Sequence, residues 1–416
     1  MPRFDFAYGH ATVEIDVPDR NLAGVLSPRP SAKVDLREAF AAAWRTPCGL
    51  SSPVDRLASA QSVAVVVTDH TRATPTQDLL LLLWERIRSV VSSSRVTLVV
   101  ATGTHRAPIE EELERMLGAW RRTFRTEVHD CDGNLVDVGR SSRGTSIQIN
   151  RTVAEADCVV TIGHVGAHYY AGYSGGRKNI FPGVAGRAAI EANHAQLMHP
   201  KSVACTYEGN PINEEMVEAA RMVNLALCID VVMDADNDVI KVVVGEPEAA
   251  HAEARAFWDR HFQIPVGRPA DLVVASAGGH PKDIDLYQAY KAQYAAARVL
   301  RDGGILLLLA ACPDGIGHRV FAEWIERSER PSDVFKVLRQ EGFRLGGHKA
   351  VYLAADLARI DVYLKSELPD DTVRRFFLCP ASGSDEAFAA ARRRFGDDFR
   401  VLVIPHAADT FPILVR

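Results

Sequence analysis

The sequence predicts an α/β protein with two α/β domains, each built on a mostly parallel β-sheet. The chain has 416 residues, too many for one small hydrophobic core. Short apolar runs typical of buried strands alternate with helical patterns along most of its length. Several of these runs end in polar loops that carry glycine, histidine and arginine. Open α/β sheets bind ligands at this end of their strands.

The composition is that of an ordinary globular protein, with 47% apolar and 24% charged residues. A net charge of -5 and the lack of a basic stripe argue against nucleic acid as the main partner. The seven cysteines are dispersed without a C-x-x-C pair, which is typical of a reducing compartment. No apolar run has the length of a signal peptide or a membrane span. We therefore expect a cytoplasmic protein without a membrane partner.

The first sixty residues predict a short β-rich segment, and the first strand–loop–helix unit follows it. Residues 63–68 read as a buried strand, and the loop at 69–75 contains Asp69 and Arg72. Thr74 as N-cap with proline at the first helical position predicts the start of the helix. Taken alone, the loop fits a solvated Asp–Arg surface pair equally well.

A second unit repeats this plan. Residues 96–100 read as a strand, the loop at 101–108 contains Thr102, Gly103 and His105, and a helix begins near Pro108. Two adjacent strands therefore both end in loops that carry histidine and arginine. Because the carboxyl ends of neighbouring parallel strands meet at one edge of a sheet, the pair of loops predicts a shared site.

The stretch 163–194 follows the strand predicted at 157–162 and concentrates histidine, lysine, tyrosine and glycine. Gly175 and Gly176 would let backbone amides approach an anion, with cationic side chains beside them. The segment matches neither the P-loop nor the dinucleotide pattern. It ends in a helix predicted over 188–198 that carries His194. A single histidine on a helix is more often a packing or surface residue than a metal ligand.

A polar segment at 262–270 predicts the domain boundary. We expect an N-terminal cofactor-binding domain over 1–266, rejoined by 405–416, and a C-terminal domain over 267–404. Strands are predicted at 272–276, 304–310, 361–364 and 400–404. Tyr287 and Lys291 share one helix face near its amino end. A cleft between the two domains is the expected place for a small ligand.

The chain resembles the nickel-pincer-nucleotide lactate racemase family, and the resemblance covers nearly its whole length in order. It rests on DHTRATP (69–75), ATGTHRAP (101–108), HYYAGYSGGRKNIFPGVAG (168–186) with ANH (192–194), and LYQAYK (286–291). Together these motifs are far more specific than any one of them.

The resemblance implies a nickel-pincer nucleotide cofactor, pyridinium-3-thioamide-5-thiocarboxylic acid mononucleotide nickel, covalently attached at Lys178. One carbon, two sulfurs and His194 would hold the nickel, and imidazole and sulfur both suit this metal. Enzymes of cofactor biosynthesis are then implied as partners.

The implied activity is that of an isomerase, a racemase or epimerase of a 2-hydroxy acid. The substrate carbon would lose a hydride to the cofactor and regain it on the opposite face. His105 and His168 would exchange the hydroxyl proton, one for each enantiomer, because neutral imidazole suits this role at physiological pH.

The resemblance also assigns binding residues. Arg72 and Lys291 would hold the substrate carboxylate, Arg72 as a bidentate fork and Lys291 as a point charge. Tyr287 and Gln288 would orient the substrate or the cofactor. Further cofactor contacts are implied for Asp69, Thr102, Gly103, Tyr170, Gly175 and Gly176.

The chain departs from lactate-specific members in having tyrosine instead of phenylalanine at Tyr169, Tyr170 and Tyr173. Each tyrosine adds a hydroxyl near the expected pocket. This favours a larger or more polar 2-hydroxy acid than lactate, such as malate, an aromatic 2-hydroxy acid or a sugar acid.

Two other functions are compatible with the residues. A zinc hydrolase would use His164, His168 and His194, although their spacing lacks an H-E-x-x-H pairing and nearby carboxylate ligands. A non-catalytic binding protein for small acids would close its cleft on the ligand. The reactive residues at every loop end argue against the second alternative.

Overall fold

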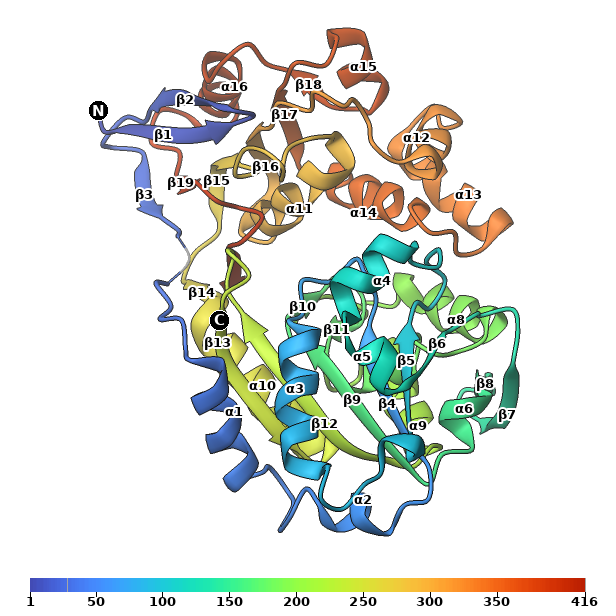
Figure 1. Ribbon diagram of the computed structural model, residues 1–416. Helices are drawn as coiled ribbons and strands as arrows, with labels where there is room; N and C mark the ends of the chain where they lie inside the picture. Colours follow the sequence, from blue (N-terminus) through green and yellow to red (C-terminus); the bar gives the residue numbers. More distant parts are fainter. Residues whose placement is uncertain (28, 416) are drawn as a thin grey trace. The chain divides into compact units, whose positions relative to one another are not determined.

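The computed structural model describes residues 1–27 and 29–415 and divides the chain into two compact units (Figure 1). One unit is Ser31–Arg260, and the other combines Met1–Pro30 with His261–Arg416. Each unit contains a six-stranded, mostly parallel sheet with helices packed on it. The predicted α/β class with mostly parallel sheets is confirmed.

The sheet of the Ser31–Arg260 unit has the strand order β13-β12-β9-β4-β5-β6. Its parallel strands are β4 (Val63–Thr68), β5 (Val96–Ala101), β6 (Arg125–Val128), β9 (Cys158–His164) and β12 (Leu225–Met233). The edge strand β13 (Val239–Gly245) runs antiparallel to β12. The chain winds in one direction from β4 to β5 and β6 and then in the other to β9 and β12. The strand order therefore reverses between β4 and β9, where doubly wound sheets bind ligands.

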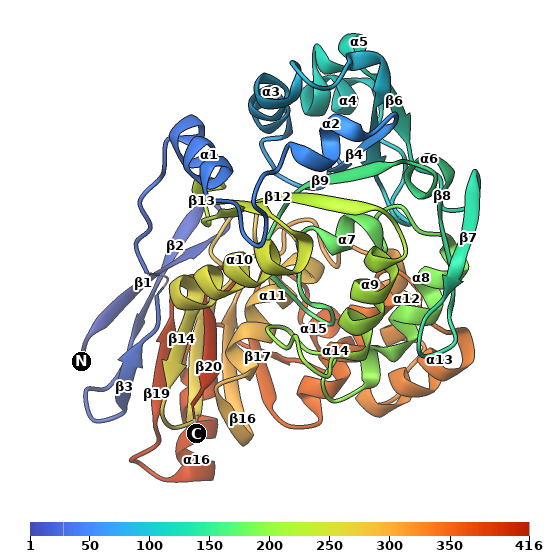
Figure 2. The ribbon, with the colours of Figure 1, turned by 90° about the horizontal axis from the view of Figure 1, so that it is seen from below.

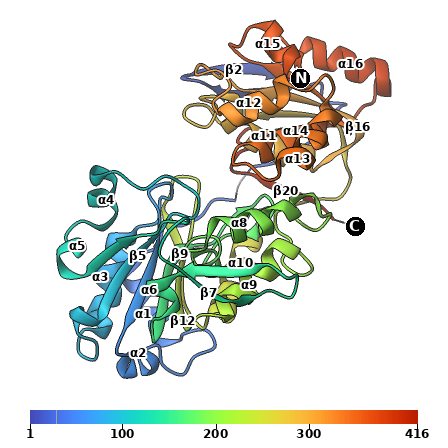
Figure 3. The same ribbon diagram turned by 90° about the vertical axis from the view of Figure 1, so that its right-hand side faces the viewer.

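Helices cover both faces of this sheet, with α3, α4 and α5 on the opposite side from α9 and α10 (Figure 3). The leucines of α3 share one core with the odd-numbered residues 63, 65 and 67 of β4 and the even-numbered residues 158, 160 and 162 of β9. Phe40 of α1 belongs to the same core. On the other face, α7 contacts β4 and β9. The helices are α1 (Leu36–Arg45), α2 (Asp55–Ser59), α3 (Thr76–Ile87), α4 (Glu110–Leu117), α5 (Trp120–Thr123), α6 (Arg151–Ala154), α7 (Arg177–Ile180), α8 (Arg187–His194), α9 (Pro211–Arg221) and α10 (Pro247–Phe262).

Small elements complete this unit. β7 (Leu135–Arg140) and β8 (Ser146–Asn150) form a hairpin, and β10 (Ala167–His168) pairs with β11 (Gly172–Tyr173) inside the glycine-rich stretch. Short 3-10 turns lie at η1 (Ser93–Arg95) and η2 (Ala195–Met198), the second directly after α8.

The sheet of the other unit has the order β18-β17-β16-β15-β19-β3, and all its strand pairs are parallel. The strands are β3 (Leu22–Val25), β15 (Ala270–Ser276), β16 (Leu300–Leu309), β17 (Asp361–Lys365), β18 (Cys379–Pro380) and β19 (Val401–Ile404). Its helices are α11 (Leu286–Ala297), α12 (Arg319–Glu326), α13 (Val334–Glu341), α14 (Gly347–Leu357), α15 (Asp370–Arg375) and α16 (Asp385–Phe395), with a 3-10 turn η3 (Pro331–Asp333).

The predicted domain ranges of 1–266 and 267–404 differ from these units, because the first thirty residues belong with the C-terminal sheet. The hairpin of β1 (Arg3–Tyr8) and β2 (Ala11–Asp16) places Phe6 in the same core as β15, β16 and α16, and β3 pairs with β19. Burial of such an aromatic side chain contributes about 1.5–3 kcal/mol.

The predicted return of 405–416 to the first domain is also corrected. β20 (Phe411–Leu414) pairs with β14 (Gln263–Val266), and both lie in the unit that contains the C-terminal sheet (Figure 2). The last residue of the predicted segment, Arg416, lies outside the described residues.

Two local expectations are corrected as well. α3 begins at Thr76 rather than at Pro75, and Thr74 is not its N-cap, because the Thr74 hydroxyl bonds to a histidine ring instead. The predicted helix at 188–198 is an α-helix to His194 and a 3-10 turn beyond it. None of the helices that the structure describes is long and apolar enough to cross a membrane.

Candidate functional site

The loops that follow β4, β5 and β9 carry most of the predicted site residues. These strands are neighbours in the sheet, with β4 in the middle. Their carboxyl ends therefore bring together the loop of Asp69 and Arg72, the loop of His105, and the glycine-rich stretch that begins at His164. The two loops from which a shared site was predicted therefore lie at the reversal of the strand order, where open α/β sheets bind ligands.

Asp69 and His105 form a tight pair across two of these loops. The buried Asp69 carboxylate lies 2.6 Å from Nδ1 of His105, and its other oxygen accepts hydrogen bonds from the Thr71 amide and hydroxyl. Burial opposes ionisation, but the bonds from His105 and Thr71 hold the pKa of Asp69 below its usual value. The carboxylate therefore accepts the Nδ1 proton of His105 and leaves Nε2 as the basic atom of the ring.

His164 is held neutral on the other side of β4. Its Nδ1 lies 3.1 Å from the Thr74 hydroxyl. Burial, together with nearby Arg72 and Lys178, lowers the pKa of His164 to about 4. Arg72 and Lys178 are thus close to His164, and all three residues lie at one edge of the sheet.

Lys178 lies one residue after the start of α7, the first turn after the two glycines. Burial, with Arg72 and Arg177 nearby, lowers the pKa of Lys178 well below its usual value. A lysine with a lowered pKa presents a larger fraction of neutral amine at physiological pH, and the neutral amine is the nucleophilic form.

His168, Tyr170 and His194 form an aromatic cluster. The ring of Tyr170 meets His168 edge-on at a centroid distance of 4.6 Å and His194 at 4.9 Å. Nδ1 of His168 accepts a hydrogen bond from the Ala171 amide, so its proton is on Nε2 when the ring is neutral. Nδ1 of the buried His194 lies 3.0 Å from the side-chain oxygen of Asn193. That contact places the proton on Nδ1 and the electron pair on Nε2.

Gly175 and Gly176 have a different role from the one predicted. The Gly176 amide donates to both oxygens of the buried Asp230, so the anion beside this amide is part of the protein. A Cβ at Gly176 would lie 2.5 Å from the Cys228 sulfur, and Gly175 has a φ of +101°. Burial raises the pKa of Asp230 to about 6, although the hydrogen bond from Gly176 and the charge of Arg177 act to lower this pKa. These glycines bring the start of α7 close to β12.

Thr102 and Gly103 likewise shape their own loop. The Thr102 hydroxyl donates to the His129 carbonyl at 2.8 Å, and the Gly103 amide donates to the Gly183 carbonyl at 2.9 Å. The second bond links the loop of His105 to the end of the glycine-rich stretch.

The three tyrosines are not equivalent. The buried Tyr173 donates its hydroxyl to Asp259 at 2.8 Å and also lies 3.3 Å from the Cys205 carbonyl. The hydroxyl predicted to face a substrate is therefore engaged within the protein at Tyr173. Tyr170 instead lies between the two histidine rings.

Tyr287, Gln288 and Lys291 lie on the first turns of α11, in the unit of the C-terminal sheet. Asp285 caps this helix and accepts the Gln288 amide at 2.6 Å. The Tyr287 ring stacks on His318 at 4.9 Å, and the buried Lys349 ammonium lies 3.6 Å from its centroid. Burial, with Lys291 nearby, lowers the pKa of Lys349 to about 7. Lys349 was missed from the sequence.

The three histidines considered for a zinc hydrolase do not form a metal site. In the described part of the chain, the only cluster of three or more metal-ligating side chains is Asp130, Cys131 and Asp132. Arg187 bonds to Asp132 at 2.6 Å and to the Cys131 sulfur at 3.1 Å, so this cluster already has a cation beside it.

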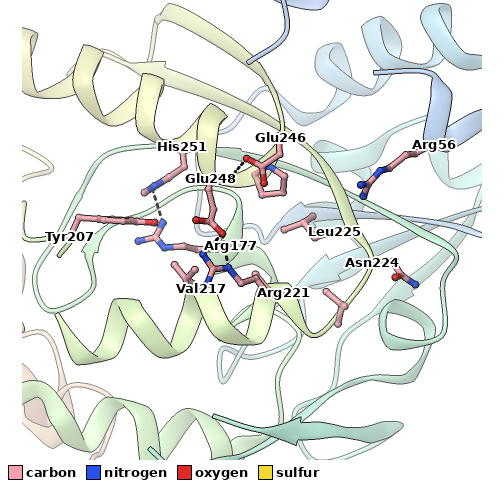
Figure 4. Close-up of a pocket in the computed structure, with 13 residues that line it drawn as sticks. Arg56, Arg177, Tyr207, Val217, Arg221, Asn224, Leu225, Glu246, Glu248 and His251 are labelled. Atoms are coloured by element: carbon pink, nitrogen blue, oxygen red, sulfur yellow. Dashed lines mark hydrogen bonds and ion pairs between the residues drawn. The ribbon is translucent and has the colours of Figure 1, made fainter. Parts of the chain in front are cut away.

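Arg177, the residue before Lys178, lines a cavity of about 240 Å³ (Figure 4). Its guanidinium contacts His251 at 2.6 Å and donates to Asn213 at 2.7 Å. His251 was expected to be solvated, but only 2% of it is exposed. Burial lowers the pKa of His251 well below its usual value, with Arg177 and Arg255 acting in the same direction. Arg177, the other cationic residue of the SGGRK motif, therefore packs inside the protein.

Sequence reasoning also missed Asn193 and Glu215, which lie behind His194. Both are fully buried, and the Asn193 amide donates to Glu215 at 2.9 Å. The available signal was the position of Glu215 on the same helical face as Ile212, Met216 and Ala219, since an acid on an apolar stripe is a buried acid.

Comparison with known proteins identifies the family of the chain. The lactate racemase N-terminal domain matches residues 8–205, and the lactate racemase C-terminal domain matches residues 266–411. A lactate racemase of Thermoanaerobacterium thermosaccharolyticum is 31% identical over the full length of both chains. A lactate racemase of Lactiplantibacillus plantarum is 31% identical over 97% of this chain and 98% of its own.

Solved structures show the same similarity. The lactate racemase apoprotein of Thermoanaerobacterium thermosaccharolyticum superposes with a TM-score of 0.90, at 29% identity and full coverage of both chains. A Thermotoga maritima protein shares the fold, with a TM-score of 0.62 at 21% identity over 93% of this chain and all of its own. The chain therefore belongs to the lactate racemase family and is an isomerase.

Proposed function

We propose that the protein interconverts the two enantiomers, or two epimers, of a 2-hydroxy acid with the help of a nickel-pincer nucleotide held at Lys178 and His194. The observation that carries this proposal is the convergence of Asp69–His105, Lys178 and the His168–Tyr170–His194 cluster on one unit. The curated relatives of similar length are both lactate racemases, and a solved relative is described as an apoprotein.

The side chains present fit the cofactor. Covalent attachment needs an uncharged amine, and the pKa of Lys178 is lowered in the required direction. A nickel ligand needs an imidazole nitrogen with its electron pair available, and the Asn193 contact sets His194 in the tautomer that has this pair on Nε2. When bound, the cofactor supplies the acceptor and donor of the substrate hydride.

His105 and His168 would handle the hydroxyl proton. Asp69 keeps the proton of His105 on Nδ1, so that Nε2 acts as the general base for one enantiomer. His168 would serve the other enantiomer. Its Nδ1 accepts a hydrogen bond from the Ala171 amide, so the neutral ring carries its proton on Nε2 and can donate it from there. The two histidines thus hold opposite proton states at their Nε2 atoms, as an exchange of one proton in two directions requires.

Arg72 would bind the carboxylate of the substrate, because a guanidinium group can donate two parallel hydrogen bonds to a carboxylate. Arg72 is exposed and lies in the same loop as Asp69. Gln288, Tyr287 and Lys291 would contribute further contacts to the substrate. A lactate-type acid is the first candidate. The hydroxyls of Tyr169 and Tyr170 keep a larger or more polar acid, such as malate or a sugar acid, as the second.

The decisive experiment is intact-mass and metal analysis of protein produced in cells that make the nickel-pincer nucleotide. The expected result is a mass addition that maps to Lys178, about one nickel per chain, and racemisation of a chiral 2-hydroxy acid by that material. Lys178→Ala should lack the addition and the activity. Full activity of Lys178→Ala, or an unmodified active wild type, would overturn the proposal.

A further inference from the structure

A chain of buried hydrogen bonds leads from His194 to Glu215. Nδ1 of His194 lies 3.0 Å from the Asn193 oxygen, and the Asn193 nitrogen donates to Glu215 at 2.9 Å and to the Ile212 carbonyl at 3.1 Å. Because the amide nitrogen has two acceptors, the Asn193 oxygen must face the imidazole. The orientation of one amide therefore determines which nitrogen of His194 carries the proton.

Glu215 is fully buried and receives hydrogen bonds from several segments. One oxygen accepts from the hydroxyls of Ser141 at 2.6 Å and Thr145 at 2.7 Å, and the other accepts from Asn193 and from Gln196 at 2.6 Å. No Lys or Arg of the described residues forms an ion pair with it within 4.0 Å. Neutral donors alone therefore compensate for the burial of this carboxylate.

Such an arrangement demands a carboxylate at this position. A buried ionised group costs several kcal/mol unless it is hydrogen-bonded. Four donors converge on two oxygens, and a glutamine would present one NH2 group to two of them. The donors come from the turn between β7 and β8, from α8 and from η2, while Glu215 itself lies on α9. Glu215 thus joins the segments that surround the end of α8, where His194 lies.

We propose that Asn193 and Glu215 are positioning residues for His194, which fix its tautomer and ring orientation so that Nε2 is presented to the metal. The inference rests on the proposed function, in which His194 is the nickel ligand. Partners behind a metal-binding histidine orient the ring and raise its basicity, and their loss typically costs about 10–100-fold in metal affinity or activity. Asn193 transmits the effect of the carboxylate because its amide donates to Glu215 and accepts from His194.

The test compares Asn193→Ala and Glu215→Gln with Asn150→Ala. Asn150 is a matched control, because it is also buried, with 1% exposed, and its amide also donates to a carboxylate, that of Glu127 at 2.7 Å. All three variants lose a buried polar interaction, but only the first two alter the partners of His194. A general loss of stability is therefore seen in all of them.

The first measurement is the proton position of His194 in protein without cofactor, read from two-bond 15N–1H correlations of labelled histidine and assigned with His194→Gln. The wild type and Asn150→Ala should show the Nδ1–H tautomer, and Asn193→Ala should show a loss of that signal. An unchanged tautomer in Asn193→Ala would overturn the inference, whatever the cofactor is.

The second measurement is the release of nickel to a chelator from cofactor-loaded protein with equal mass addition at Lys178. Asn193→Ala and Glu215→Gln should release nickel about 10–100-fold faster than the wild type, and Asn150→Ala should match the wild type. Equal release from all variants would overturn the inference. A wild type with no mass addition would instead overturn the proposed function and leave the tautomer measurement to decide whether Asn193 positions His194.

Discussion

At the scale of single residues, the site depends on how neighbours set the proton positions of its histidines. Asp69 does this for His105, Asn193 for His194 and the Ala171 amide for His168. In each case Nδ1 is engaged by a neighbour, and the chemistry is left to Nε2. The three rings differ in whether Nε2 carries the proton, and in the proposed function that difference would allow them to have different roles.

Asp69→Asn should reduce racemisation about 100-fold or more, because the amide no longer holds the proton of His105 on Nδ1 by charge. The mass addition at Lys178 should persist, since Lys178 does not contact this pair. The measurement is kcat for a 2-hydroxy acid in both directions. Thr71→Val is the control: it removes a hydroxyl donor to Asp69 but keeps the carboxylate, and should cost less than about fivefold. Wild-type kcat in Asp69→Asn would contradict the role given to this pair.

His164 should make the fold sensitive to acid. Its folded pKa of about 4 lies below the usual 6.5, so the unfolded chain binds a proton that the folded chain does not. The stabilisation is complete above pH 6.5 and is lost as the pH falls through 4. Between pH 7 and pH 4.5 the loss amounts to about 2 kcal/mol. Denaturant unfolding of the wild type and His164→Gln at both pH values measures it. The difference between the two proteins should shrink or reverse at the lower pH, and parallel changes would contradict the assignment.

At the scale of elements, the sequence predicted the strands that carry the site but not the purpose of every loop residue. The apolar runs of β4, β5 and β9 were sufficient to predict these strands, because strands that are buried on both faces of a parallel sheet have nearly continuous apolar sequences. Gly175 and Gly176 were predicted to admit an external anion. The Gly176 amide instead donates to Asp230, which lies fifty-four residues further along the sequence. Such a long-range pairing leaves no local pattern. Glu215 also bonds to residues far away in sequence, Ser141 and Thr145, and only its position on the apolar face of α9 indicated a buried acid.

Gly175→Ala should weaken both the fold and the attachment at Lys178. A Cβ there would lie 2.5 Å from a Val165 methyl, at a φ of +101° that side chains rarely adopt. The expected loss is about 1–3 kcal/mol of unfolding free energy, with a lower fraction of modified Lys178. Gly396→Ala is the control, because Gly396 also has positive φ, +81°, but no atom lies within 4 Å of its added Cβ. Equal modification of Lys178 in both variants would mean that the close approach of α7 to β12 is not needed.

At the scale of the whole chain, the sequence predicted the α/β fold class and the two sheets. It did not predict to which unit the two ends of the chain belong. The segment 22–25 is a short strand with no mark of the sheet it joins, and chain proximity favoured the first domain. The structure places it beside β19, across most of the sequence. Met1–Pro30 is therefore part of the unit that contains α11, whereas the prediction assigned this segment to the other domain.

Phe6→Ala offers a direct check of this allotment. Phe6 is fully buried in the core of β15, β16, β19 and α16, and its truncation should cost about 3–5 kcal/mol. Hydrogen exchange should therefore accelerate in β15, β16 and β19 and remain slow in β4, β5 and β9. Phe40→Ala is the matched reciprocal, since Phe40 is equally buried in the core of the other unit. It should accelerate exchange in β4, β5 and β9 alone. If Phe6→Ala instead loosened the strands that carry the loops of Asp69 and His105, the first thirty residues would belong with the N-terminal sheet, as their place in the sequence had indicated.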